Sequence, residues 1–384
     1  MQTSFGIYIH WPFCVSKCPY CDFNSHVRES IDTDLWQKSL LADLHHIHKL
    51  SKNRIVTSVF FGGGTPSLMP PKIAEALINE IHKLWQVDAN VEITLEANPN
   101  SVEAQKLADF SKAGINRVSI GVQSLRQKDL EFLGRKHSVE EAYKAIDIAD
   151  KEFKRFSFDL IYTRPNQTLK GWEDELKEAL SIGTSHLSLY QLTIEQGTPF
   201  NLAYHRGDFS LPDDDKSADF YELTNDIMQS HGLPAYEISN YAKPGQECRH
   251  NLTYWHYDDY LGIGPGAHSR ITLESNKYAI RRHRSPELWL QHIRENDKIL
   301  ENKELITSQR KAEEFFMMGL RLTSGISADR IHHEFGRPVY EILNADKLNA
   351  LQQEGLMVMD DKVIRLTPAG LIRLNKILQF LFYQ

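Results

Sequence analysis

The sequence has little cysteine and no long apolar run. Only four cysteines occur in 384 residues, which is too few for a framework of disulfides and favours a reducing compartment. No apolar stretch approaches the roughly 18 residues that a membrane-spanning helix needs. Because the first residues pass almost directly into a strand-like segment, a signal peptide is not expected. We therefore expect a cytoplasmic protein, and peripheral association with a membrane stays compatible with the sequence.

The sequence also lacks an excess of positive charge. Its formal net charge is −7, which disfavours a general binder of nucleic acids, so no nucleic-acid partner is expected. The hydrophobic and charged fractions, 41% and 25%, are those of an ordinary globular protein. A chain of this length can bury a large core and form about two domains.

Short β-branched or aromatic runs alternate with amphipathic stretches, which is typical of parallel βα units. The expected strands are residues 5–10, 55–61, 91–95, 117–122, 156–162 and 186–193. The expected helices between them are residues 33–50, 71–85, 102–113, 139–152 and 169–182. Right-handed crossovers would place the C-terminal ends of all these strands on one rim. The pattern predicts an α/β fold with a partial (β/α)6 barrel.

The alternation lapses after residue 194. The segments expected next are a helix, a strand-like stretch and a glycine-rich turn, at residues 214–231, 234–241 and 262–266. The expected division of the chain is a barrel core, a barrel extension and a C-terminal domain, over residues 1–200, 201–300 and 301–384.

The last part of the chain has a different pattern. From about residue 307, a helix–turn–helix is followed by a hairpin over 356–366 and a helix from 368, which predicts a winged-helix-like α+β domain. Its expected second helix, 338–346, is acidic where a DNA-reading helix is basic. We therefore expect this domain to act as a lid or a substrate-facing domain.

Three of the four cysteines lie within eight residues, in the pattern C-x3-C-x2-C: Cys14, Cys18 and Cys21. An odd number of thiols in such short loops suits a disulfide framework poorly, but thiolates are good ligands for a soft metal or an iron–sulfur cluster. Zinc is the alternative, and its fourth ligand would be His10, His26 or Cys248. Aromatic residues suited to shielding a redox centre surround the loop: Tyr8, Trp11, Phe13 and Tyr20.

This cysteine spacing after a first strand, with Tyr20 directly before the last cysteine, resembles the radical S-adenosylmethionine (SAM) superfamily. Four further stretches resemble the family of oxygen-independent coproporphyrinogen III oxidase (HemN) and its relatives. They are Tyr8-x-His10-x-Pro12-Phe13-Cys14, Gly62-Gly63-Gly64-Thr65-Pro66, Gly121-Val122-Gln123-Ser124 and Asp159-Leu160-Ile161-Tyr162. The resemblance covers nearly the whole chain and implies the partial barrel of that superfamily.

The resemblance implies that Cys14, Cys18 and Cys21 hold a [4Fe–4S] cluster, whose open iron binds the amino and carboxylate groups of SAM. It also implies a flavodoxin- or ferredoxin-type electron donor. The residues that match cofactor-binding positions of the family are Tyr8, Tyr20, Gly63, Gly64, Thr65, Glu96, Gln123, Arg135 and Asp159.

These residue types suit such a site. Glycines at a strand end let the backbone approach a ligand closely, and an arginine can form a fork onto a carboxylate. Taken singly, the glycine run is compatible with a plain turn. Glu96 and Asp159 are likewise compatible with structural roles, such as pairing with Arg117 or Arg135.

Two features separate the branches of this family. HemN-type oxidases carry a fourth cysteine soon after the triad and an N-terminal extension, whereas here Asp22 follows Cys21 and thirteen residues precede Cys14. The stretch from His250 to Trp255, His-Asn-Leu-Thr-Tyr-Trp, instead resembles the H-N-x-x-Y-W motif of the HemW branch. The resemblance therefore favours a haem chaperone that delivers haem to acceptor proteins. The alternative is an oxidase that converts coproporphyrinogen III to protoporphyrinogen IX.

The H-N-x-x-Y-W stretch also suggests a haem site. His250 would be an axial ligand, Tyr254 and Trp255 would stack on the macrocycle, and Cys248 is a second candidate ligand. The alternative is an ordinary packed aromatic turn. One departure concerns Thr163-Arg164-Pro165, where relatives have Gly-Leu-Pro. It predicts an arginine on the rim and a changed substrate pocket.

Overall fold

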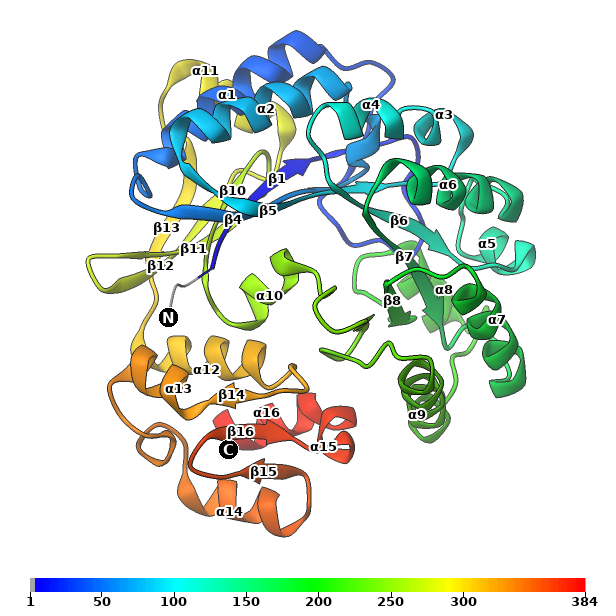
Figure 1. The fold of residues 1–384 in the computed structure, drawn as a ribbon, viewed down its shortest axis with the longest axis vertical. Coiled ribbons are helices and arrows are strands. Elements are labelled where there is room, and N and C mark those ends of the chain that lie inside the picture. Colours follow the sequence, from blue (N-terminus) through cyan, green and yellow to red (C-terminus); the bar gives the residue numbers. More distant parts are fainter. Residues whose placement is uncertain (1–3, 384) are drawn as a thin grey trace.

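The computed structural model describes residues 4–383. One sheet of eleven strands curves across the molecule, with helices on its convex side and a small C-terminal domain below its concave side (Figure 1). The strand order is β13-β12-β11-β10-β1-β4-β5-β6-β7-β8-β9.

Six parallel strands form the centre of this sheet, and they are neighbours in the order of the sequence. They are β1 (Phe5–Trp11), β4 (Ile55–Gly63), β5 (Gln86–Ala97), β6 (Arg117–Gln123), β7 (Arg155–Tyr162) and β8 (His186–Gln191). The helices between them are α1 (Thr33–His48), α2 (Pro71–Leu84), α3 (Ser101–Ala104), α4 (Leu107–Lys112), α5 (Gln127–Phe132), α6 (Val139–Glu152) and α7 (Leu169–Ser181). The predicted partial (β/α)6 barrel is confirmed, although the helix expected over 102–113 consists of two short helices, α3 and α4.

Later segments of the chain extend both edges of the same sheet. Strand β10 (Asp259–Ile263) pairs in parallel with β1 and is continued by the antiparallel strands β11 (His268–Leu273), β12 (Asn276–Arg282) and β13 (Leu300–Leu305). At the other edge β9 pairs antiparallel with β8. It spans only Asn240–Ala242, whereas a longer strand was expected over 234–241. Segments expected in the core and in the extension therefore share one sheet, and the boundaries at residues 200 and 300 stay predictions.

The remaining elements of this part connect the strands. Strands β2 (Phe13–Cys14) and β3 (His26–Val27) form a two-stranded ribbon at the cysteine loop, and the 3-10 helix η1 (Pro66–Leu68) follows β4. The other helices are α8 (Pro199–Arg206), α9 (Asp214–Ser230), α10 (Arg249–Trp255) and α11 (Pro286–Glu295). None of the helices formed by residues 4–383 has both the length and the apolar character needed to span a membrane.

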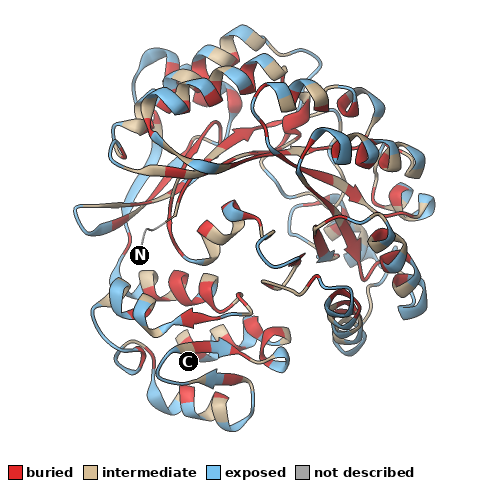
Figure 2. Ribbon diagram, viewed as in Figure 1, coloured by how far each residue is buried: buried red, intermediate tan, exposed pale blue. Residues whose placement is uncertain are grey.

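The two faces of the parallel centre differ in chemistry because successive strand residues point to opposite sides. On the convex side, Ile7, Phe61 and Val118 are buried in the main core beneath the helices (Figure 2). The concave side carries polar residues, including Ser58, Glu92, Glu96, Arg117, Ser119, Ser157 and Asp159. A parallel sheet of this kind usually reads as apolar on both faces. A polar concave face therefore needs either a ligand or a further protein element to satisfy it.

Helix α10 supplies that element for one end of the concave face. It lies between the sheet and the C-terminal domain and contacts β1 and β4 (Figure 1). The H-N-x-x-Y-W stretch is thus helical, because Arg249–Trp255 forms α10. The face is left open at the other end, towards the C-terminal ends of the strands.

The C-terminal domain has its own apolar core, which includes Phe316, Leu348 and Ile364. Its elements are α12 (Ser308–Gly319), β14 (Ile326–Ser327), α13 (Ala328–Phe335), η2 (Val339–Glu341), α14 (Ala345–Gln353), β15 (Met357–Met359), β16 (Val363–Leu366), α15 (Pro368–Ile372) and α16 (Leu374–Phe382). The predicted α+β domain with its hairpin is confirmed. The helix expected over 338–346 is wrong, because only the 3-10 turn η2 forms there. The side chain of Asn344 accepts hydrogen bonds from the backbone N–H groups of Asp346 and Lys347 and so begins α14 later.

Polar contacts join this domain to the sheet. Glu314 on α12 accepts hydrogen bonds from Tyr257 and from Arg270, at 2.9 Å each. Arg330 on α13 pairs with Asp258 at 2.7 Å. These contacts hold the C-terminal domain beside α10 and below the open end of the concave face (Figure 1).

Candidate metal centre and ligand cavity

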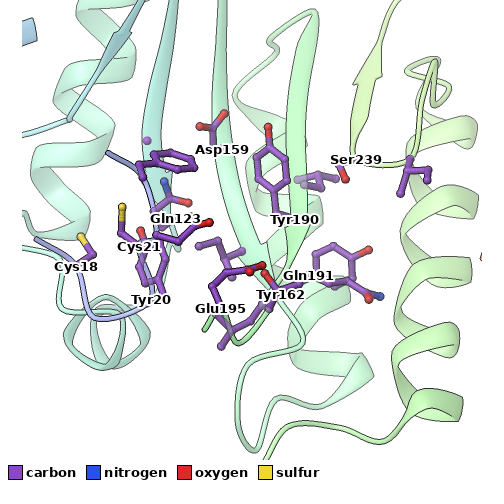
Figure 3. A pocket seen from close by; sticks show the side chains of 18 of the residues that line it. Cys18, Tyr20, Cys21, Gln123, Asp159, Tyr162, Tyr190, Gln191, Glu195 and Ser239 are labelled. Carbon is purple, nitrogen blue, oxygen red and sulfur yellow. The ribbon is translucent and has the colours of Figure 1, made fainter. Parts of the chain in front are cut away.

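A cavity of about 1150 Å³ lies at the C-terminal ends of the parallel strands. Most residues that the sequence predicted for the site line it: Cys14, Cys18, Tyr20, Cys21, Gly63, Gly64, Thr65, Glu96, Gln123, Arg135 and Asp159. Figure 3 shows Cys18, Tyr20 and Cys21 at one side of the cavity, Ser239 at the other, and Asp159 and Tyr190 between them. Tyr8 and His250 do not line it. The individual roles of these residues stay predictions.

The cysteine loop is held in place by strand β1. The Nε2 atom of His10 lies 2.9 Å from the carbonyl oxygen of Asn24, and its Nδ1 atom lies 3.1 Å from the Tyr8 hydroxyl. The side chain of Asn24 donates to the carbonyls of Pro265 and Arg284, at 3.0 Å each. Tyr8 therefore contacts His10, which in turn holds the cysteine loop, and Tyr8 itself does not line the cavity.

The sulfur atoms meet hydrogen-bond donors that suit thiolates. The Thr65 hydroxyl lies 3.4 Å from Cys14 Sγ, and Arg135 Nη1 lies 3.4 Å from Cys18 Sγ. Burial raises the pKa of the Cys14 and Cys21 thiols, so their thiolates need a cationic partner such as a metal centre. Three half-buried thiols that open onto one cavity, two of them with donors, fit a cluster bound through three cysteines.

A single zinc ion fits this loop less well. Among residues 4–383, no three His, Cys, Asp or Glu side chains are close enough together to hold one metal ion. A cubane cluster binds its three thiolates on separate iron atoms, so it needs them farther apart than one ion does. Both ring nitrogens of His10 already have partners. Cys248 is buried at 3.4 Å from Glu92, away from the loop.

The glycine run at the end of β4 is required by neighbouring protein atoms. A Cβ at Gly63 would lie 2.7 Å from the His10 ring, and a Cβ at Gly64 would lie 2.7 Å from the carbonyl oxygen of Phe13. Gly63 also has a φ of +119°, which side chains rarely adopt. The run is therefore not a plain turn: the end of β4 packs directly against β1 and the cysteine loop. Because Gly63 and Gly64 also line the cavity, the absence of side chains there lets a ligand approach the backbone as well.

Two partly buried carboxyl groups face the cavity. Burial, together with nearby Asp159, raises the pKa of Glu96 to about 8. Burial raises the pKa of Asp159 to about 6, although the Ser119 hydroxyl lies 3.3 Å from its Oδ1 atom. Arg117 donates instead to Ser157, at 2.7 Å. These carboxyl groups are thus placed to accept a cation or a hydrogen-bond donor from a ligand.

Arg135 is directed towards the cysteine loop. Besides its contact with Cys18, its Nη2 atom donates to the side-chain oxygen of Asn98 at 2.5 Å and to the carbonyl of Gly121 at 2.8 Å. The Nε atom is buried without a partner among the described residues. In this arrangement the guanidinium places positive charge next to the Cys18 sulfur. A fork onto the carboxylate of SAM stays a prediction.

The cavity also has a wall that the sequence did not reveal. Its lining includes Tyr162, Tyr190, Tyr221, Arg321, Arg373 and Lys376. Tyr162 and Tyr190 lie at or near strand ends, where a search for rim residues would have found them. The cations lie in or beside the C-terminal domain, and no local motif indicates that they reach the barrel. Their position depends on how the two parts of the chain pack.

The haem site predicted at His250 has no opening in this structure. The ring is 1% exposed, with Nδ1 at 2.9 Å from the Ser58 hydroxyl and Nε2 at 2.8 Å from the Tyr254 hydroxyl. Burial lowers the pKa of His250 to about 3. Burial, with Glu92 nearby, also raises the pKa of the Cys248 thiol to about 12. Neither residue offers a free ligand to an iron, and haem ligation there stays a prediction.

Trp255, at the end of the same motif, contacts the C-terminal domain. The guanidinium of Arg321 lies 4.5 Å above its ring and also pairs with Glu237 at 2.8 Å. Cation–π contacts of this kind contribute about 0.5–2 kcal/mol. The two ends of α10 therefore have different roles, because His250 packs into the barrel while Trp255 holds the neighbouring domain.

Arg164 does not change the cavity. It is 2% exposed and pairs with the buried Glu175 of α7, with a second carboxylate, Asp129, at 3.2 Å. It is not among the residues that line the cavity. The expected arginine on the rim is therefore wrong, because a buried carboxylate draws this side chain into the layer of helices.

The comparisons with known proteins agree with this geometry. The family model described as Radical SAM superfamily matches residues 8–179, and the HemN C-terminal domain model matches residues 306–373. The solved structure of coproporphyrinogen III oxidase (HemN) from Escherichia coli, a radical SAM enzyme, superimposes with a TM-score of 0.81 at 21% identity. That likeness covers 99% of this chain and 90% of the oxidase, and it supports the fold. The fold and the cysteine loop define a radical SAM protein with a HemN C-terminal domain.

Relatives that match nearly the whole chain show which family within this class it belongs to. The heme chaperone HemW of Escherichia coli is 36% identical over 97% of each chain. The mitochondrial radical S-adenosyl methionine domain-containing protein 1 of Danio rerio is 34% identical over 97% of this chain and 86% of that protein. The chain belongs to the family of these radical SAM proteins. Membership of the superfamily implies a [4Fe–4S] cluster and SAM.

Proposed function

We propose that the protein is a haem chaperone that binds a [4Fe–4S] cluster and SAM and delivers haem to acceptor proteins. The observation that carries this proposal is the cavity of about 1150 Å³, which exceeds the ~300–1,000 Å³ of a site for one small ligand. One end of it holds the cysteine loop and the predicted SAM residues, which leaves room for a second large ligand. The similarity to proteins named heme chaperones supports haem as that ligand.

The residues at the cysteine end suit the two cofactors. Cys14, Cys18 and Cys21 would hold the cluster, with Thr65 and Arg135 donating to two of the sulfurs. When bound, the cluster and SAM supply one-electron chemistry. Glu96, whose pKa is raised to about 8, keeps its proton near neutral pH until a cation such as the ammonium or sulfonium of SAM lowers that pKa.

An electron donor of the flavodoxin or ferredoxin type would have to reach the cluster. The cysteine loop carries two apolar side chains that are largely exposed: Val15, at 65%, does not line the cavity, whereas Phe23, at 61%, also borders it. Apolar side chains exposed beside a redox centre favour a transient partner at that place. We therefore place the donor on the outer side of the loop.

A second candidate function is that of a coproporphyrinogen III oxidase. The likeness of the fold to HemN favours it. Against it stands the sequence after Cys21, Asp22-Phe23-Asn24, where HemN-type oxidases carry a fourth cysteine. Anaerobic incubation with SAM, a strong reductant and coproporphyrinogen III tests this directly. We expect no protoporphyrinogen above the level of a Cys14→Ser control.

The chaperone function is tested with protein whose cluster has been reconstituted anaerobically. Titration with haem should produce a saturable change in the Soret band, and the bound haem should then pass to an apo-haem protein such as apomyoglobin. Transfer should be faster than from albumin, used as a carrier with no such function. A wild-type protein that shows no saturable Soret change would contradict the proposal.

A further inference from the structure

The cavity has two ends with different linings. The cysteine end is formed by the cysteine loop and the strand ends with Glu96, Gln123 and Asp159. We call the other part the outer half, and it is lined mainly by Tyr190, Tyr221, Ile238, Leu371, Arg373 and Lys376. The predicted cluster and SAM residues that line the cavity all belong to the cysteine end. The outer half is therefore the part of the cavity that the cluster and SAM leave free.

The floor of the outer half is aromatic and aliphatic. Tyr190 is 39% exposed although it lies in β8, a central strand, and it lines the cavity. Its ring stands between Asp159 and Ser239 (Figure 3). Leu192 and Ile238 from the barrel and Leu371 from the C-terminal domain complete this floor. Such a surface suits the flat apolar face of a macrocycle.

The mouth of the outer half carries positive charge that the protein does not neutralise. Arg373 and Lys376 line it and are exposed. In the described part of the chain neither has a carboxylate partner within 4 Å, and the side chain of Arg373 makes one hydrogen bond, to the carbonyl of Ala369. Arg321 differs, because Glu237 and Trp255 already hold it. Two free cations at the mouth suit the carboxylates of a ligand whose ring is buried.

Acidic residues also line the cavity, but on other elements than the two cations. Glu195 follows β8, and Asp214 and Asp215 begin α9, so these acids belong to the barrel. Arg373 and Lys376 belong to the C-terminal domain, at the junction of α15 and α16. A ligand with an apolar edge and a dianionic edge would accordingly be oriented with its carboxylates towards the C-terminal domain.

We propose, resting on the chaperone function above, that haem occupies the outer half with its ring over Tyr190 and its propionates on Arg373 and Lys376. The α10 motif then has an indirect part in binding. His250 packs in the barrel with both nitrogens engaged, and Trp255 holds Arg321 and with it the domain that carries the two cations. The C-terminal domain is in this way a wall of the haem site.

The test is a haem titration of the full-length, cluster-containing protein, followed in the Soret band. The double variant R373E/K376E reverses both charges at the mouth. Loss of two charge-assisted contacts predicts that haem binding weakens about tenfold or more. The matched control is K362E/R365E, which makes the same change of charge at exposed positions of the same domain that do not line the cavity. We expect the control to bind within about twofold of wild type.

A second ligand separates the propionates from the ring. Haem dimethyl ester, whose propionates are masked, should bind wild type and R373E/K376E equally. Cluster content and SAM binding should match wild type in both double variants. Equal haem affinity of wild type and R373E/K376E would overturn this assignment while leaving the chaperone function intact. If wild type binds no haem at all, the proposed function itself fails.

Discussion

The two ends of the concave face both carry polar strand residues, but one end is covered by protein and the other faces a cavity. At one end, α10 covers the strands, and His250 has a hydroxyl partner on each ring nitrogen. At the other end no element within residues 4–383 lies directly over the strands, and Glu96 and Asp159 face a cavity. The difference teaches that a buried polar residue on this face is structural where the protein supplies its partners. Where the protein does not, the residue is a candidate for ligand binding.

The direction of the pKa shifts follows the same division. Burial lowers the pKa of His250 to about 3, so this ring stays neutral and needs no counter-charge. Burial and Asp159 raise the pKa of Glu96 to about 8, which leaves a carboxyl group that gains from an incoming cation. The polar groups at the closed end thus have their partners within the protein, whereas those at the open end gain a partner only when a ligand binds. Three experiments can break or sharpen this comparison.

The largest expected effect concerns the thiols of the two ends. Replacing Cys14, Cys18 or Cys21 with serine should abolish the bound cluster, because the loop offers only three thiolates and the cluster needs all three as ligands. Replacing Cys248, the thiol at the closed end, should leave the iron and sulfide content at the wild-type level. Iron and sulfide analysis after anaerobic reconstitution measures both results. Loss of the cluster from the Cys248→Ser protein would contradict this difference between the two ends. So would a cluster colour retained after replacement of Cys14, Cys18 or Cys21.

The next effect concerns stability at the closed end. A His250→Phe substitution leaves the Ser58 and Tyr254 hydroxyls without their partner, which costs about 1–3 kcal/mol for each group in the free energy of unfolding. The wild-type protein should also lose stability as the pH falls below about 6.5, the unfolded pKa, towards the folded value of about 3. That loss approaches about 1.4 kcal/mol per pH unit at pH values well below 6.5, because only the unfolded state takes up the proton there.

The variant lacks this proton uptake, so its deficit should shrink by about 1 kcal/mol between pH 6.5 and pH 5.5. Urea unfolding at several pH values measures the difference, and cluster content should be unchanged. Parallel pH dependence of the two proteins would show that His250 is not buried in the neutral form.

The smallest expected effect concerns SAM at the open end. Because an ionised Glu96 attracts the cationic groups of SAM, affinity should rise with pH up to about 8, the pKa of this carboxyl group, and then level off. The rise approaches tenfold per pH unit well below the pKa. Glu96→Gln should bind more weakly above pH 8 and show no such rise. Equilibrium binding of SAM to the cluster-containing protein, at pH 6 to 9, measures it.

The matched control for that experiment is Glu195→Gln, another carboxylate on the lining of the cavity. It should keep the pH dependence of the wild type. A Glu96→Gln protein that keeps the rise would show that a different group titrates.

Much of the fold followed from local patterns in the sequence. The six parallel strands and the long helices between them were predicted, because alternating apolar runs and capping residues are local signals. The exceptions are β5, which begins five residues earlier than expected, and the short helices α5, α8, α10 and α11, which were not expected. The wrong segments are those where a local signal was weaker than a neighbouring one. In the stretch 338–346 the cap at Asn344 starts α14 later than expected, and only the short 3-10 helix η2 forms before it. Strand β9 is short because only Asn240–Ala242 reaches the edge of the sheet.

The site was predicted in part. The cysteine loop and the strand-end residues were predicted together because parallel strands bring their C-terminal ends to one rim. Tyr8 and His250 were predicted to face the ligands but do not line the cavity. The sequence does not show which part of a strand a later helix, here α10, will cover. Arg164 was placed on the rim, but Glu175, eleven positions later, pairs with it in the interior.

The sequence by itself determined the parallel βα framework, the thiol loop and the order of residues around the rim, since these depend on short-range spacing and on the fixed hand of the crossovers. Only the tertiary structure decided which end of the polar face stays open, where His250 points, and that Arg373 and Lys376 reach the cavity. These outcomes depend on contacts between segments far apart in the chain, and such contacts form only when the C-terminal domain and α10 pack against the sheet.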